Sequence, residues 1–295
     1  MKKEITAHIF LLLVSFIWGV TFTLVKDAIS YVDVFVFLLQ RFLIAFLFFI
    51  PFVLFYKKSF HIATLVHGIF LGTLLFLAYA FQTIGLKFTT ASNAGFVTGL
   101  NVVLVPIINS MFFKKHIPVN AKVGSVLATI GLFFLCVNSN FYINKGDIIV
   151  FFCAICVALH IIFTGRYTKF HNAFNLAFVQ MGTICLLSGL VACIYKKGPE
   201  LFIVEKHTVW ALIICSVFAS NFAFWAQTYF QRFTIPTKVA IIFTGEPVFG
   251  AMYANIFGGE ILSTRGILGG FLIVLSMVLS EVDFKKIFQK GHMVP

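Results

Sequence analysis

Apolar and polar residues follow one another along this chain in long blocks. Ten apolar runs, separated by short polar connections, cover about residues 7–26, 34–55, 65–86, 92–112, 119–137, 147–166, 173–194, 208–230, 238–257 and 264–281. An α-helix needs about 20 mostly apolar residues to cross the hydrocarbon core of a bilayer. The pattern therefore predicts an all-α integral membrane protein with ten transmembrane helices, no soluble domain, and the lipid bilayer as its main surroundings.

Composition and charge placement agree with this prediction. Of the 295 residues, 60% are hydrophobic and 11% are charged, whereas a soluble domain of this length needs more polar surface. The formal net charge is +12, but the basic residues form short pairs between apolar runs, such as Lys57-Lys58, Lys114-Lys115 and Lys285-Lys286. Such pairs set membrane topology. Because no basic stripe carries interleaved aromatic residues, nucleic acid is not expected as a partner.

The distribution of Lys and Arg also predicts an orientation. With the N-terminus in the cytoplasm, fourteen basic residues fall on the cytoplasmic side and seven on the outer side. Cytoplasmic loops carry the excess of such residues. We predict a multi-pass protein of the bacterial inner membrane with both termini in the cytoplasm. The start Met1-Lys2-Lys3 resembles a signal peptide, but no small-residue cleavage site follows, so we interpret it as an uncleaved first helix.

The two halves of the chain share a sequence pattern. At a shift of 145 residues, Gln82-Thr83 aligns with Gln227-Thr228, and Thr89 aligns with Thr234. Several such matches in order indicate a duplication. Each half holds five spans, and because five is odd the second half enters the membrane from the opposite side. We therefore predict two inverted five-helix repeats, residues 1–140 and 141–295, an architecture typical of secondary transporters.

Several motifs carry a resemblance to a known family. They are Ser15-Phe16-Ile17-Trp18-Gly19, Arg41, the stretch from Gln82 to Phe96, Val105-Pro106, Gly146-Asp147 with Ala158, the stretch from Ala226 to Arg232, and Glu246-Pro247. In order and spacing they resemble the EamA family of the drug/metabolite transporter superfamily over essentially the whole chain. The resemblance implies ten helices around a central cavity and carriage of amino acids, nucleobases, sugars or other metabolites, often outward. It implies no single cargo.

Two prolines lie within spans 4 and 9. Pro106 and Pro247 each remove an N–H donor and free the carbonyl four residues earlier, at Val102 and Phe243. A freed carbonyl in a membrane needs a side chain, water or cargo as its partner. Helix breaks at corresponding points of two repeats indicate a binding site near the midplane. The alternative is a kink that serves packing alone.

Charged and titratable groups inside spans are the next candidates. Glu246 is the only acid well inside a span and Arg41 the only base there. Intramembrane charge is costly and faces the protein interior. Glu246 is either a proton-coupling or cation-binding carboxylate or a structural group. Arg41 either binds a carboxylate or phosphate of the cargo or pairs structurally, for example with Glu246. His160 either titrates near neutral pH or makes a structural hydrogen bond.

Aromatic and amide side chains on shared helix faces are candidates for substrate binding. Such a mixture suits a small zwitterion or a heterocycle, and the alternative is ordinary hydrogen bonding between helices. The candidates are Trp18 in span 1, Tyr79 in span 3, Thr98 and Asn101 in span 4, and Asn221 and Trp225 in span 8. Small residues in spans 5 and 10, including Gly124, Gly131 and Gly269, predict close helix packing, either within one chain or in a homodimer.

The predicted function is secondary transport of a small polar metabolite, such as an amino acid or related compound, with export favoured and protons as the coupling ion. Two alternatives stay open: a non-transporting membrane subunit of a lipid-handling or signalling complex, and a membrane-embedded enzyme. An enzyme predicts clustered His, Asp or Glu at an interface, and the sequence shows no such cluster and no GxxxxGK[ST] motif. We therefore predict no catalytic residue, metal or cofactor.

Overall fold

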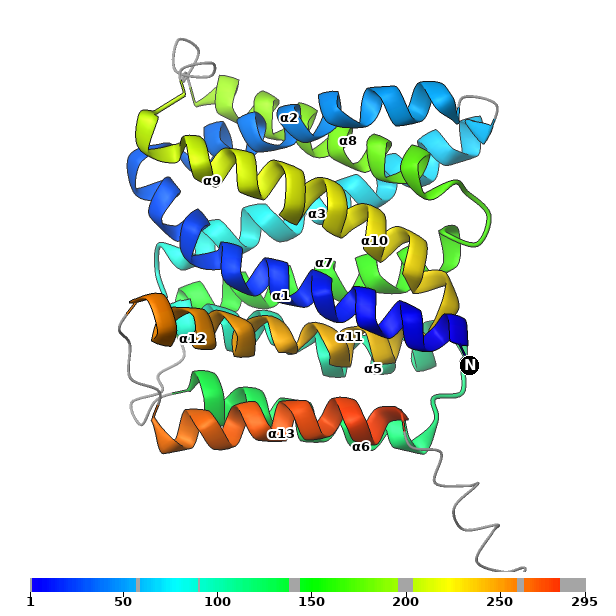
Figure 1. Cartoon of the computed structure of the whole chain (residues 1–295), viewed down its shortest axis with the longest axis vertical. Helices are drawn as coiled ribbons and strands as arrows, with labels where there is room; N and C mark the ends of the chain where they lie inside the picture. Colours follow the sequence, from blue (N-terminus) through cyan, green and yellow to red (C-terminus); the bar gives the residue numbers. More distant parts are fainter. Residues whose placement is uncertain are drawn as a thin grey trace, which may run out of the picture.

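A computed structural model describes residues 2–56, 59–89, 91–137, 144–195, 204–258 and 263–281. Within these ranges ten helices are long and apolar enough to cross a membrane, which confirms the predicted number of spans. Most helices run roughly parallel to one another (Figure 1). The basic residues Lys57, Lys58, Lys196, Lys197, Lys285, Lys286 and Lys290, used for the orientation, lie outside the described residues.

The first helix of the first half is longer than the predicted span. α1 spans Lys2–Tyr31 and so extends beyond both ends of the predicted run 7–26. Neither flank contains a Gly or Pro that would end the helix. The other helices of this half are α2 (Val34–Phe55), α3 (Ile62–Leu86), α4 (Ala91–Gly99), α5 (Asn101–Phe113) and α6 (Val119–Cys136). The Asp33 side chain caps α2 by accepting a hydrogen bond from the Phe35 N–H at 3.0 Å.

The second half has the same order of spans with more irregular helices. Its elements are α7 (Lys145–Tyr167), α8 (Ala173–Ile194), η3 (Lys206–Thr208), α9 (Val209–Ile214), the π-helix η4 (Cys215–Phe222), α10 (Ala223–Phe230), η5 (Gln231–Phe233), α11 (Pro236–Phe243), α12 (Gly245–Gly258) and α13 (Thr264–Glu281). Span 8 therefore runs from η3 to η5 and contains two turns of π-helix, a conformation often found at functional sites. The sequence pattern did not predict it.

Spans 4 and 9 are each broken into two helices. α4 and α5 meet at Leu100, after Gly99, and α11 and α12 meet at Thr244, before Gly245. Glycine is a poor helix former, which favours a break at both points. The prediction that Pro106 itself interrupts span 4 is wrong, because Pro106 lies inside continuous α5. Pro247 lies in the first turn of α12. Backbone N–H groups in a first turn have no partner within the helix, so the missing N–H of Pro247 costs no helical hydrogen bond.

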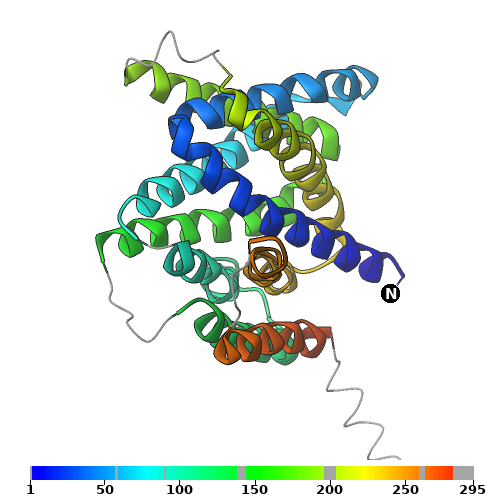
Figure 2. The same cartoon turned by 60° about the vertical axis from the view of Figure 1, so that its left-hand side comes forward.

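Helix pairing joins the two halves. α2 packs against α8 at one end of the long axis, and α6 packs against α13 at the other (Figures 1 and 2). Between these pairs α3 contacts α7, and α10 contacts α1. In the predicted repeat, span 3 corresponds to span 8 and span 1 corresponds to span 6. The contact of span 3 with span 6 is therefore equivalent to the contact of span 8 with span 1. The N-terminal end of α1 and the C-terminal end of α13 lie on the same side of the molecule.

Glycines bring α6 and α13 together. A Cβ on Gly131 would lie 2.8 Å from the Gly269 carbonyl oxygen, and one on Gly124 would lie 3.1 Å from the Ser276 carbonyl oxygen. This confirms the prediction of close helix packing. The contact lies within one chain, so these faces are already covered by the chain itself.

Candidate functional site

Arg41 ties α2 to the π-helix. The residue is 4% exposed, and its Nε donates a hydrogen bond to Ser220 Oγ at 2.9 Å. In return, Ser216 Oγ donates to the Arg41 carbonyl oxygen at 3.0 Å. Ser216 and Ser220 both belong to η4, so the irregular part of span 8 is the part that holds the buried guanidinium.

Two aromatic rings lie close to this guanidinium. Its Cζ lies 5.4 Å from the ring centroid of Tyr79 and 5.2 Å from that of Phe42. The face of an aromatic ring attracts a cation, most strongly away from water. No carboxylate of the described residues lies within 4.0 Å of Arg41, so Arg41 and Glu246 form no direct ion pair. Contacts nevertheless link the two residues. Ser220, which accepts from Arg41, follows Ala219, the hydrogen-bond partner of Trp18 Nε1, and Gly19, the residue after Trp18, faces the Glu246 backbone.

Glu246 lies at the break in span 9. It is the second residue of α12, where the helix dipole favours negative charge. Its backbone carbonyl faces Gly19 of α1 so closely that a Cβ there would collide with it. The carboxylate receives no hydrogen bond or ion pair from the described residues, and the side chain keeps partial exposure although it is in the middle of a span. A carboxylate at this depth without a partner among the described residues is a candidate for binding a cation or a proton.

Trp18 connects the same break to the π-helix. Its Nε1 donates a hydrogen bond to the Ala219 carbonyl oxygen at 2.9 Å. Its ring packs edge-on against Phe243, the last residue of α11, with centroids 5.0 Å apart. Trp18 thus forms an aromatic wall one turn away from Glu246.

The break in span 4 reaches the same region. Asn101 Nδ2 donates to the Thr98 carbonyl oxygen at 2.8 Å across the break, while the buried Asn101 Oδ1 has no partner among the described residues. Thr98 Oγ1 lies 4.0 Å from Cys153 Sγ. α5 and α11 are in contact. Val102 and Phe243, which lie close to the two breaks, belong to one buried apolar cluster.

The other candidates are placed differently. Asn221 is 3% exposed beside Ser220, and neither amide atom has a partner among the described residues. Trp225 stacks on Phe174, with centroids 5.4 Å apart, and lines a separate pocket of about 300 Å³. His160 makes a buried hydrogen bond to Gln180 Oε1 at 2.9 Å, between α7 and α8. Trp225 packs against the same apolar cluster as Trp18 and Tyr79. The Phe224 ring lies beside both Trp18, at 5.4 Å between centroids, and His160, at 6.3 Å.

Sequence reasoning missed a histidine cluster at the ends of spans 3 and 6. His67 Nδ1 and His171 Nε2 are hydrogen-bonded at 2.8 Å, and Thr64 Oγ1 bonds the other ring nitrogen of His171 at 2.9 Å. The His67 ring stacks on Tyr167, with centroids 3.9 Å apart. Burial lowers the pKa of His171, and the charges of His67 and His61 lower it further. No spacing in the sequence joins these residues, because they come from different helices.

These elements define a helical multi-pass membrane protein with charged and aromatic side chains around two broken spans. The sequence profile of the EamA-like transporter family matches residues 5–137 and residues 144–281. The chain therefore belongs to the EamA-like transporter family, as the sequence motifs predicted.

Individual relatives agree with this assignment. An uncharacterised transporter of Archaeoglobus fulgidus is 35% identical over 277 residues, which cover 94% of this chain and 86% of that protein. The uncharacterised transporter YyaM of Bacillus subtilis is 24% identical over 292 residues, covering 95% of this chain and 94% of that protein. A crystal structure at 16% identity has a TM-score of 0.79 and covers 96% of this chain and 98% of that one, so the fold is shared. The family and its relatives point to a membrane transporter rather than an enzyme.

Proposed function

We propose that this chain is a secondary transporter that exports a small polar metabolite, such as an amino acid or related compound, from a site between Arg41 and Glu246. The observation that carries the proposal is the partly exposed Glu246 carboxylate at a helix break, which has no partner among the described residues and lies in one region with a buried Arg41. A zwitterion presents an ammonium group to the carboxylate and a carboxylate to the guanidinium. Trp18 and Tyr79 supply aromatic walls for an apolar part of the cargo.

Alternating access follows from the arrangement of the broken spans. Breaks at Leu100 and Thr244 lie at corresponding points of the two proposed repeats, residues 1–140 and 141–295. The separate matches of the family profile to residues 5–137 and 144–281 support this division. In inverted-repeat transporters the two repeats rock about a central site, and half-helix ends face the cargo. With the predicted orientation, the cytoplasmic side is the side of the N-terminal end of α1 and the C-terminal end of α13 (Figure 1).

Proton coupling follows from the single carboxylate. Glu246 binds either the ammonium group of the cargo or a proton, but not both at once. Proton entry on one side of the membrane therefore displaces the cargo on that side, and cargo loading on the other side displaces the proton. Arg41 stays charged throughout because a guanidinium does not lose its proton in proteins. A homodimer, also proposed from the sequence, would use faces other than the covered glycine face of α6 and α13.

The test begins with the purified protein. A thermal-shift screen of amino acids, amines, nucleobases and sugars should identify compounds that raise the unfolding midpoint, and proteoliposomes should then carry those compounds faster than protein-free liposomes. A non-transporting subunit predicts the opposite result, namely stabilising ligands without flux above the protein-free control. That outcome would overturn the proposal.

A further inference from the structure

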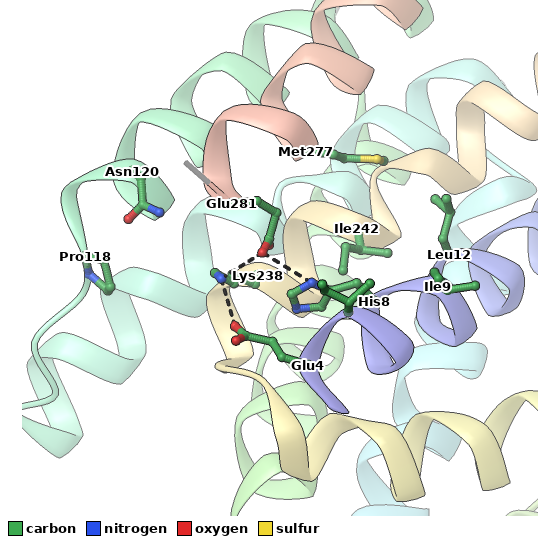
Figure 3. Close-up of a pocket in the computed structure, with 11 residues that line it drawn as sticks. Glu4, His8, Ile9, Leu12, Pro118, Asn120, Lys238, Ile242, Met277 and Glu281 are labelled. Atoms are coloured by element: carbon green, nitrogen blue, oxygen red, sulfur yellow. Dashed lines mark hydrogen bonds and ion pairs between the residues drawn. The ribbon is translucent and has the colours of Figure 1, made fainter. Parts of the chain in front are cut away.

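A groove of about 710 Å³ opens between α1, α6, α11 and α13, at the end of the molecule that holds the N-terminus (Figure 3). It lies apart from the site between Arg41 and Glu246, which shares none of its lining residues. One part of the groove has an apolar wall, and the opposite end has a polar lining. The apolar lining includes Ile5, Ile9, Leu12, Ile242 and Met277, and the polar lining includes Glu4, His8, Asn120, Lys238 and Glu281.

The polar end is a connected cluster of charges. Lys238 Nζ lies 3.0 Å from Glu4 Oε1 and 3.0 Å from Glu281 Oε2, and His8 Nδ1 lies 3.3 Å from the same Glu281 oxygen (Figure 3). The other ring nitrogen of His8 is hydrogen-bonded to Thr234 Oγ1 at 2.8 Å. The carboxylates of Glu4 and Glu281 face the single ammonium of Lys238, so these three side chains together carry one net negative charge.

Exposure within this cluster is uneven. The side chains of Glu4 and Glu281 are 41% and 42% exposed, whereas those of Lys238 and His8 are 13% and 14% exposed. The bases are thus buried behind the acids. A ligand that enters the groove therefore meets carboxylate oxygens first, and a positively charged group is favoured.

The apolar wall belongs to the lipid-facing side of α1. Ile5 is 53% exposed and Ile9 is 62% exposed, on the first turns of a span. In a bilayer an apolar groove at this depth excludes water and is filled by hydrocarbon. Glu4, at the start of the same helix, and Glu281, at the end of α13, lie where lipid headgroups begin. A ligand of this groove is therefore an amphiphile with a cationic end.

We propose that the groove binds a phospholipid whose headgroup ends in a primary ammonium, of the ethanolamine type, with its chain along Ile5 and Ile9 and its ammonium on the exposed side of the Glu4 and Glu281 carboxylates, outside Lys238. A primary ammonium donates three hydrogen bonds to such oxygens. A trimethylated choline group donates none, and an anionic headgroup is repelled by the net charge. This binding does not depend on transport.

A metal ion is the competing occupant. Ligand atoms of Glu4, His8 and Glu281 lie within 4.8 Å of one another. However, the Lys238 ammonium already lies between the two carboxylates, at 3.0 Å from each. A divalent cation would have to displace it or be repelled by it. A monovalent lipid ammonium is repelled half as strongly as a divalent ion at the same distance, and it can bind Glu4 Oε2 and Glu281 Oε1, which make no hydrogen bond to the described residues. The ammonium headgroup is therefore favoured over the metal.

The proposal is tested with the full chain, purified and delipidated in detergent. Native mass spectrometry measures binding of phosphatidylethanolamine, phosphatidylcholine and phosphatidylglycerol with the same acyl chains. The wild type should prefer the ethanolamine lipid over the choline lipid by about threefold to fivefold, as expected for partly exposed ion pairs. Glu4→Gln should remove most of this preference. Asp27→Asn, which removes an exposed carboxylate from the other end of α1, should retain it.

A second pair of variants tests the groove without disturbing the ion pairs. Ile9→Trp fills the apolar wall and should weaken binding of the ethanolamine lipid, whereas Leu13→Trp, at a 41% exposed position outside the groove, should not. Equal binding of the two zwitterionic lipids by the wild type would overturn the proposal, as would unchanged binding by Ile9→Trp. A third outcome would assign the cluster to a metal instead. In that case the lipid-free wild type binds Zn²⁺, Glu4→Gln abolishes this binding, and the wild type shows no headgroup preference.

Discussion

The contact between α6 and α13 allows a quantitative prediction at Gly131. In Gly131→Ala the new Cβ would lie 2.8 Å from the Gly269 carbonyl oxygen and 3.0 Å from the Ile273 backbone nitrogen. Both are backbone atoms, which cannot rotate away, so the two helices must separate. Overpacking of this kind costs about 1–3 kcal/mol. The better helix propensity of alanine returns about 1 kcal/mol, so we expect a net loss of up to about 2 kcal/mol in the free energy of unfolding.

Gly95 provides the matched control. It also lies inside a helix, α4, but a Cβ at this position meets no atom within 4 Å. Gly95→Ala should therefore leave stability unchanged or raise it by about 0.5–1 kcal/mol. Unfolding of both variants is measured by heat and by SDS titration in mixed micelles. The reasoning is refuted if Gly131→Ala is as stable as Gly95→Ala. Cargo affinity of folded Gly131→Ala should stay near wild type, because Gly131 lies outside the site.

Three further predictions concern topology, pH and cargo. A cysteine at Ser59 should be labelled only from the cytoplasm and one at Lys197, outside the described residues, only from the other side; reversed labelling would contradict the orientation. The lowered pKa of His171 means that the folded protein binds fewer protons than the unfolded chain below pH about 6.5, so stability falls as the pH falls from there towards the folded pKa. His171→Gln should therefore reduce the drop in unfolding midpoint between pH about 7.5 and about 5.5, and an undiminished drop would count against this role. Arg41→Lys keeps the charge but loses the planar fork, so cargo affinity should fall about tenfold in a folded protein; unchanged affinity would exclude Arg41 from the site.

The spans could be predicted because a run of about twenty apolar residues is long enough to cross a bilayer, and ten such runs in one chain could not all be buried in a soluble core. The predicted run 34–55 coincides with α2, and the predicted run 173–194 coincides with α8. The position of the break in span 4 was missed. A proline alone does not decide where a helix ends, because neighbouring helices re-satisfy the backbone, and α5 runs through Pro106.

The central site was partly accessible from the sequence. Arg41 and Glu246 stand out because charge inside a span is costly and rare, and the structure brings both into one region. Trp225 was placed beside Asn221 by α-helical spacing. The π-helix up to Phe222 shifts that spacing, and Trp225 lines another pocket.

Clusters made by different helices could not be predicted. Lys238 meets Glu4 and Glu281 from three separate elements, and nothing in the local sequence around Lys238 shows which helices pack beside it.

The most direct test of the central claim is transport by Glu246→Gln in proteoliposomes. The substitution keeps the shape of the side chain and removes its charge and its titration. Loss of a charge-assisted hydrogen bond should weaken cargo binding by about 1.5–3 kcal/mol, so transport is measured at saturating cargo. We predict that the wild type exchanges cargo and accumulates it against its gradient when a pH gradient is imposed, whereas the variant exchanges cargo but does not accumulate it. Accumulation at the wild-type level by a well-folded Glu246→Gln protein would contradict the role proposed for Glu246.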